Sequence, residues 1–85
     1  MTKKSILVRL NRGMENRPEA MLVQVASQFS SKVEIALNNK SMNAKSIMGV
    51  MALGLDSGDE VMVSADGADE AEAMKEIEAY LTQAS

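Results

Sequence analysis

Apolar and polar residues alternate in three stretches of the chain, and this alternation predicts β-strands with one buried face and one face in water. The stretches cover residues 6–10, 33–37 and 61–65. Asn38-Asn39 follows the second stretch, and asparagine tolerates the left-handed backbone conformation that a tight hairpin turn needs. Residues 40–43 are therefore expected to return as a further strand beside residues 33–37.

Two longer stretches repeat their apolar residues at helical spacing, which predicts helices with one buried face. The first helix is expected to begin at Pro18, because proline suits the first helical turn, and to be closed by Ser30-Ser31. The second follows Asp69, which together with Glu72 three residues later resembles a capping box. The core-facing positions are Leu22, Val23, Ala26 and Phe29 in the first helix and Met74, Ile77 and Leu81 in the second.

A shorter helix is predicted over residues 47–53, between Ser46 as a favourable N-cap and Gly54 as a residue that readily ends a helix. The order of elements is then β-α-β-β-α-β-α within a single domain over residues 1–85. Strands with one apolar face suit an antiparallel sheet that helices cover on one side. The pattern therefore predicts an α+β fold, with a four-stranded antiparallel sheet covered on one face by three helices.

The chain of 85 residues contains neither cysteine nor histidine. This composition excludes disulfides, thiolate metal sites, and catalysis by Ser-His-Asp or Cys-His groups. A domain of this size also buries only about 60–65% of the surface of its unfolded chain, which leaves little room for a deep catalytic cleft. We therefore expect no enzymatic activity, no cofactor and no metal, but a protein that binds partners at its surface.

The N-terminal segment is basic and then apolar, but its apolar part is short and is interrupted by Arg9. It is interpreted as a strand rather than as a signal peptide. No apolar run reaches the length of a membrane span, so no contact with a membrane is expected. For a chain without cysteine or a targeting segment, the cytosol is the simplest compartment.

Charge is unevenly distributed, with eight basic and three acidic residues up to Ser46 and one basic and nine acidic residues after it. The basic N-terminal half is either an ordinary solvated surface or a face that attracts an anion or an acidic partner. Phe29 and Tyr80 are the only aromatic residues, too few for a base-stacking platform. Direct binding of nucleic acid is therefore not expected.

Residues 13–20 form a loop that enters the first helix and carries Arg17 in its first turn. The free N–H groups of the helix, its dipole and the guanidinium group together suit an anion. The simpler interpretation is that Glu15 or Asn16 caps the helix while Arg17 is solvated. Both interpretations stay open on these residues alone.

Ser46 also has two interpretations, as a helix cap and as a site of phosphorylation. A phosphoryl group there would meet the positive end of a helix, with Lys45 beside it as a screening charge. Met48 and Met51 are hard to bury on so short a helix, so an exposed apolar patch is expected next to Ser46, with Met21 of the first helix as a further member. Exposed methionines suit adaptable protein–protein contacts.

Together these segments resemble the HPr family, the small phosphocarriers of the bacterial sugar phosphotransferase system. The resemblance covers nearly the whole chain. It is carried by the element order and by four segments: Gly13 to Pro18, Asn38-Asn39-Lys40-Ser41, Ala44-Lys45-Ser46 and Asp69-Glu70. It implies the open-faced β-sandwich of that family.

Phosphocarriers of this family hold their phosphorylated histidine at the position that Glu15 occupies here. The subgroup that lacks this histidine is Crh, the catabolite-repression HPr-like proteins, and residues 43–49 resemble it further. The resemblance implies that HPr kinase/phosphorylase phosphorylates Ser46 and that the product acts as corepressor of a CcpA-type transcription regulator. The residues implied to bind partners are Arg17, Ala20, Met21, Gln24, Lys45, Ile47, Met48 and Met51.

The chain departs from the Crh pattern at Glu15, where glutamine is typical, and at Glu19, where alanine is typical. An alternative interpretation is therefore a phosphocarrier whose histidine is lost or replaced by Glu15. A hydrolase using Glu15 and Glu19 is a weaker alternative, because carboxylates on an exposed turn lack the burial that separates their pKa values. Monomer and homodimer both stay open.

Overall fold

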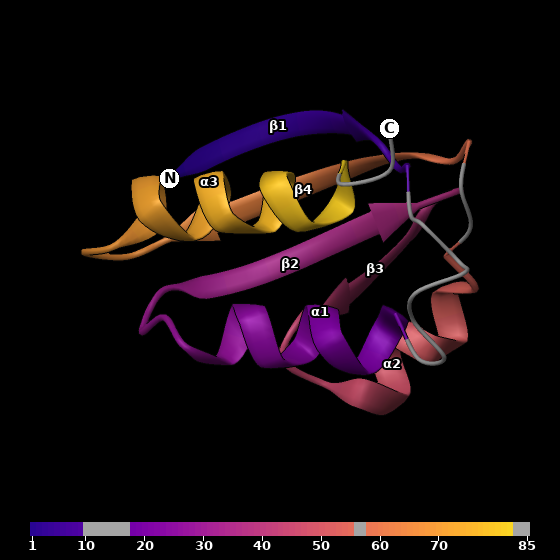
Figure 1. The fold of residues 1–85 in the computed structure, drawn as a ribbon, viewed down its shortest axis with the longest axis horizontal. Coiled ribbons are helices and arrows are strands. Elements are labelled where there is room, and N and C mark those ends of the chain that lie inside the picture. The colour runs from indigo at the N-terminus through magenta and orange to yellow at the C-terminus, as the bar shows by residue number, and fades with distance from the viewer. Residues whose placement is uncertain (10–17, 56–57, 83–85) are drawn as a thin grey trace.

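Four antiparallel strands form one sheet in the computed structural model, which describes residues 1–9, 18–55 and 58–82 (Figure 1). The strands lie in the order β1-β4-β2-β3, so β1 and β3 are the edges. Their bounds are β1 (Thr2–Leu7), β2 (Lys32–Leu37), β3 (Lys40–Asn43) and β4 (Glu60–Asp66). The predicted four-stranded antiparallel sheet is confirmed.

The described residues also form three helices, α1 (Pro18–Ser27), α2 (Ile47–Leu53) and α3 (Glu70–Leu81). Figure 1 shows α3 lying over β1 and β4, with α1 beside it on the β2 side of the sheet. The short α2 packs against α1. The helices thus cover one face of the sheet, and the other face is left open. This is the predicted α+β architecture.

The core lies between the sheet and the helices, because strand residues alternate between the two faces. Val61, Val63 and Ala65 of β4 are fully buried under the helices, whereas Met62 between them is 45% exposed on the open face. The helices contribute Leu22, Ala26, Val50, Ala73, Met74, Ile77 and Leu81 to the same cluster. The predicted core positions in α3 are therefore confirmed, whereas Val23 and Phe29 lie at the margin of the core and are only partly buried.

The first strand begins earlier and ends earlier than the predicted range of residues 6–10. It runs from Thr2 to Leu7, and its polar first half pairs with β4 across Thr2↔Ala65 and Lys4↔Val63. Val8 follows the last residue of the strand and is buried, and its N–H donates to the carbonyl of Asp59 at 2.8 Å. The alternation pattern missed the polar half because an edge strand pairs through its backbone even where its side chains stay in water.

The hairpin between β2 and β3 follows the prediction. Asn38 and Asn39 both have positive φ, 52° and 68°, the conformation that a two-residue turn of this kind requires at both central positions. Leu37 pairs with Lys40 directly across the turn.

The end of α1 and the start of α3 differ from the prediction. α1 ends at Ser27 rather than at Ser30-Ser31. The Asp69 carbonyl accepts the Ala73 N–H at 2.9 Å, but its side chain makes no capping hydrogen bond to α3, so the predicted capping box with Glu72 is wrong. Its carboxylate instead accepts the N–H groups of Ser30 at 2.9 Å and Ser31 at 3.0 Å, and the hydroxyl of Ser31. The connection after α1 is thereby fastened to the start of α3.

Glu70, the residue after Asp69, fastens the N-terminus to the same turn. Its carboxylate accepts the Thr2 hydroxyl at 2.6 Å and the Gly67 N–H at 3.2 Å, and it lies 3.2 Å from the amino group of Met1. Gly67 packs so closely against Ser31 that a Cβ atom on it would lie 2.7 Å from the Ser31 Cα. A side chain at this position would push the two turns apart.

The first prediction concerns Asp69. The hydrogen bond from Ser31, followed by that from the Ser30 N–H, lowers the pKa of Asp69 from 3.8 to about 2. Because the pKa is lower in the folded state, the carboxylate stabilises the fold above pH 3.8 and loses this effect as pH falls towards 2. We expect Asp69→Asn to lower the free energy of unfolding at pH 7, and the deficit relative to the parent to shrink at acid pH.

Urea unfolding of both proteins between neutral pH and pH 2 measures this difference. Asp66→Asn is the matched control, because Asp66 ends β4 just before this turn, and its ion pair among the described residues is with the amino terminus, at 3.9 Å. A deficit for Asp69→Asn that stays constant over the whole pH range would contradict the assignment.

Candidate docking surface around Ser46

Ser46 is the N-cap of α2, as predicted. Its backbone is extended, with φ −104° and ψ 113°, and its side-chain oxygen accepts the N–H of Gly49 at 3.2 Å. Gly54 ends the helix in the left-handed conformation, with φ 66°. A serine in this position satisfies one of the N–H groups that the first helical turn leaves without a partner.

The turn before Ser46 fixes where its side chain lies. Asn43 accepts the Lys45 N–H with its side-chain oxygen at 2.8 Å and the Ser46 N–H with its carbonyl at 3.0 Å. Ala44 between them is buried, and its N–H donates to the Val33 carbonyl at 2.9 Å. Ser46 is therefore held at a defined point at the end of β3, although it is itself only half-buried.

Lys45 does not point its charge freely into solvent beside Ser46. Its ammonium group donates to the carbonyl of Phe29 at 2.7 Å, just after α1, and the residue is half-buried. A cation near the carbonyl groups at a helix end is electrostatically favourable. Lys45 thus joins the entrance of α2 to the end of α1, a role that the sequence analysis did not anticipate.

One side of α2 faces the core and the other faces water. Val50 and Leu53 are buried, whereas Ile47, Met48 and Met51 are 39%, 79% and 60% exposed. We call these three exposed residues the α2 patch. Their exposure confirms the prediction that so short a helix cannot bury all its apolar residues. Exposed apolar side chains gathered on one helix are typical of surfaces that bind another protein.

The α1 residues that the family resemblance implies as partner-binding lie on the helix next to α2. Ala20 and Met21 are half-buried and Gln24 is exposed. Contacts between α1 and α2 bring these two helices together. Glu15 and Arg17 lie outside the described residues, as does the side chain of Glu19, so the anion site and the carboxylate pair inferred from the sequence stay predictions.

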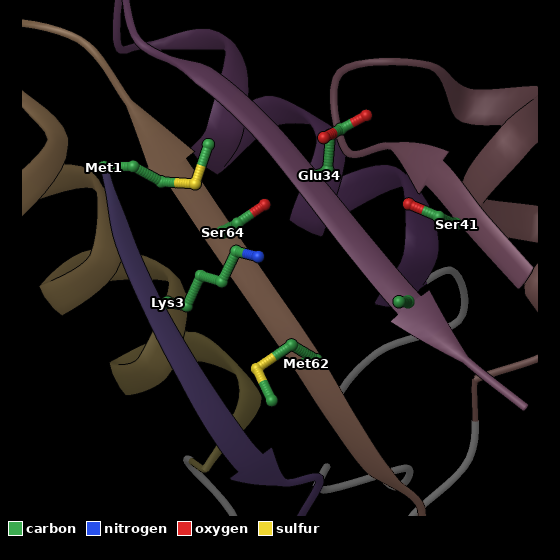
Figure 2. A pocket seen from close by; sticks show the side chains of 7 residues that line it. Met1, Lys3, Glu34, Ser41, Met62 and Ser64 are labelled. Carbon is green, nitrogen blue, oxygen red and sulfur yellow. The ribbon is translucent and has the colours of Figure 1, made fainter. Parts of the chain in front are cut away.

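The open face of the sheet carries a second surface feature, a hollow of about 190 Å³ (Figure 2). Figure 2 shows Lys3, Met62 and Ser64 standing on this face, with Glu34 and Ser41 on the neighbouring strands. The hollow is smaller than the roughly 300–1,000 Å³ of small-molecule sites.

Within residues 1–9, 18–55 and 58–82, no group of three or more acidic residues could hold a metal ion. No helix in this part of the chain has the length and apolar character of a membrane span. Among the described residues, the α2 patch beside Ser46 is the surface that we treat as the candidate docking site.

Comparison with known proteins gives a consistent picture. A family model described as "PTS-HPr: PTS HPr component phosphorylation site" matches residues 2–83. The chain is 42% identical to the HPr-like protein Crh of Bacillus subtilis over 83 residues, which cover 98% of each chain. Among solved structures, the phosphocarrier protein HPr of Bacillus anthracis superposes with a TM-score of 0.87 at 36% identity, over 94% of this chain and 95% of that one.

A crystal structure of Bacillus subtilis Crh matches with a TM-score of 0.74 at 42% identity, over 98% of this chain and 95% of that one. It is described as an intertwined dimer formed by swapping.

The second prediction concerns the stability that the Ser46 cap supplies. Ser46→Ala removes the acceptor for the Gly49 N–H and should lower the free energy of unfolding by about 1 kcal/mol. Ser46→Asp is the matched control, because aspartate caps helices about as well as serine and should keep most of this stability. Chemical denaturation measures both, and equal losses for the two variants would show that the cap bond contributes nothing specific.

Proposed function

The chain belongs to the PTS-HPr family, and on this premise we propose that it is a regulatory HPr-like adaptor in carbon catabolite repression rather than a sugar phosphocarrier. In this proposal HPr kinase/phosphorylase phosphorylates Ser46, and the phosphorylated chain acts as corepressor of a CcpA-type transcription regulator. The observation that carries the proposal is the position of a hydroxyl group at the helix cap directly beside the exposed α2 patch.

A phosphoryl group on Ser46 would add a charge of about −1.5 to −2 and three strong acceptor oxygens. The start of α2 tolerates this charge, because the first N–H groups of a helix and its dipole favour an anion. The ammonium group of Lys45 is already bound to the Phe29 carbonyl. The new charge therefore stays available to arginine or lysine of a partner, which bind phosphate through charge-assisted hydrogen bonds.

The α2 patch supplies the second half of the binding surface. Met48 is 79% exposed and Met51 60%, so both side chains can be covered by a partner without any change in the fold. Apolar contacts of this kind give affinity but little direction, whereas the phosphate gives direction and control. Together they suit an adaptor that binds weakly before phosphorylation and tightly after it.

A phosphocarrier role finds no support in the residues present. The chain contains no histidine, and Glu15 occupies the position that the family uses for phosphotransfer. Glu15 could accept a phosphoryl group only as an acyl phosphate, as carboxylates do in some enzymes. The neighbouring Glu19 would repel a phosphorylated donor. The alternative, a carrier that has lost its histidine, can therefore be tested by whether the chain relays phosphoryl groups to sugar.

The third prediction tests the adaptor. Incubation with HPr kinase and ATP should place one phosphate on Ser46, as read by mass spectrometry. Calorimetric titration into a CcpA-type regulator should then show an affinity about 10- to 150-fold higher than that of the unmodified chain, since a charge-assisted contact adds roughly 1.5–3 kcal/mol. The mass of the chain in solution should be measured alongside, because the related Crh forms a dimer.

Two variants serve as controls for this titration. Ser46→Ala should abolish both the modification and the gain in affinity. Ser46→Asp should reproduce the gain only in part, because one carboxylate has less charge and fewer acceptors than a phosphate. Equal affinities of the modified and unmodified chains would mean that Ser46 is only a cap, and the interpretation as a carrier without its histidine would then replace the adaptor.

The fourth prediction concerns phosphotransfer. In a reconstituted sugar phosphotransferase system with this chain as the only carrier, we expect no sustained phosphorylation of sugar, because no imidazole is available to relay the phosphoryl group. Glu15→His should restore acceptance at least in part, and Glu15→Gln is the control that removes the charge without adding an imidazole. Sustained transfer by the unmodified chain would contradict the proposal.

A further inference from the structure

Apart from Met1, the two most exposed methionines of the described residues both lie in the α2 patch. Met48 is 79% exposed and Met51 60%, and their three-residue spacing puts both on the same side of α2. Met74 of α3, by contrast, is 5% exposed in the core. Two accessible thioether groups therefore lie side by side in the surface assigned to docking.

We propose that Met48 and Met51 form a site of reversible oxidation by peroxides, and that their sulfoxides prevent docking of the partner at the α2 patch. The inference deepens the proposed function and rests on it for the second half of this statement, the loss of docking. The first half, preferential oxidation of these two residues over the buried Met74, depends on the structure alone.

The reaction is a transfer of one oxygen atom. The sulfur lone pair attacks one oxygen of hydrogen peroxide, the O–O bond breaks, and the second oxygen leaves as water after taking up the proton of the first. The thioether is oxidised by two electrons to the sulfoxide, and the peroxide is reduced by two. Methionine sulfoxide reductase reverses the step, so the modification can act as a switch.

The fold is expected to survive this modification. α2 is anchored by Val50 and Leu53, which are buried, and by the Ser46 and Gly54 caps, none of which contains sulfur. A sulfoxide on Met48 or Met51 would point into water, where its oxygen is readily hydrated. Oxidation of Met74 would instead place a polar oxygen in the core and destabilise the fold.

Docking, in contrast, should be sensitive to the same oxygen atoms. A partner that covers the α2 patch must strip water from each sulfoxide, and an apolar contact surface offers it no hydrogen bond in return. The phosphate on Ser46 would be unaffected. The two modifications on one surface would therefore act in opposite directions, one creating and the other removing a partner's binding energy.

Met62 provides a matched comparison elsewhere on the molecule. It is 45% exposed on the open face of the sheet, beside Lys3 and Ser64 (Figure 2). Peroxide should reach it as well, but this face is the one that the helices leave uncovered, opposite to α2. Its oxidation should have no effect on docking at the α2 patch.

The test uses the full chain phosphorylated on Ser46 and treated with limiting hydrogen peroxide. Peptide mass spectrometry should show sulfoxide at Met48 and Met51 well before Met74, with an unchanged circular dichroism spectrum. Binding to the CcpA-type regulator should weaken by about tenfold or more, and methionine sulfoxide reductase should restore it. In the Met62→Leu variant, peroxide should weaken binding to the regulator by the same factor. In the double variant Met48→Leu/Met51→Leu, peroxide should leave the affinity for the regulator unchanged.

A second measurement does not depend on the variants. A partly oxidised sample is mixed with less regulator than is needed to bind it all, and the bound molecules are analysed. They should be depleted of sulfoxide at Met48 and Met51 but not at Met62. Equal sulfoxide content at all three residues in the bound and free fractions would overturn the inference, as would oxidation of Met74 as fast as Met48.

These outcomes separate the inference from the proposed function. If the phosphorylated chain does not bind the regulator before peroxide treatment, the proposed function is wrong, and the loss of docking falls with it. If it binds and its affinity is unchanged by oxidation of Met48 and Met51, the inference alone is wrong.

Discussion

Burial of only one face of the sheet determines which helices the core needs and which apolar residues are left in water. Val61, Val63 and Ala65 face the helices and are fully buried, and a chain of 85 residues supplies only one layer of helix to cover them. The longer helices α1 and α3 provide most of this cover (Figure 1). The seven-residue α2 reaches the core with Val50 and Leu53 alone, so its other apolar residues must lie in water. The α2 patch is thus a consequence of the size of the fold, and it lies beside the one serine that caps this helix.

Two side chains fix the position of the chain segment that follows α1, close to the entrance of α2. Asp69, which lies just before α3, accepts hydrogen bonds from the N–H groups of Ser30 and Ser31. Lys45, at the entrance of α2, donates a hydrogen bond to the Phe29 carbonyl. Lys45 is thereby engaged within the fold rather than beside Ser46. In the proposed switch, Lys45 keeps this internal contact and a partner neutralises the phosphate on Ser46.

Patterns in the sequence predicted those parts of the structure that depend on interactions between residues close together in the chain. Alternation located the buried halves of the strands, Asn38-Asn39 located the hairpin, and the Ser46 and Gly54 caps located α2 with its exposed methionines. The polar start of β1 was missed because its pairing is made by the backbone. The contacts of Asp69 with Ser31 and of Lys45 with Phe29 join residues 38 and 16 positions apart, and no local pattern indicates them. A negative charge before a helix is expected to cap it, but here the tertiary contact is the stronger competitor.

Mapping of backbone amide signals by NMR can show whether a phosphate on Ser46 and the α2 patch act as one docking surface. The chain phosphorylated on Ser46 is titrated with the CcpA-type regulator while each amide resonance is followed. If the phosphate and the α2 patch form one docking surface, the largest changes fall on Ile47, Met48 and Met51 of α2 and on Ala20 and Gln24 of α1 beside it. Changes centred on Lys3, Met62 and Ser64 of the open sheet face, with α2 unaffected, would show that the regulator binds elsewhere.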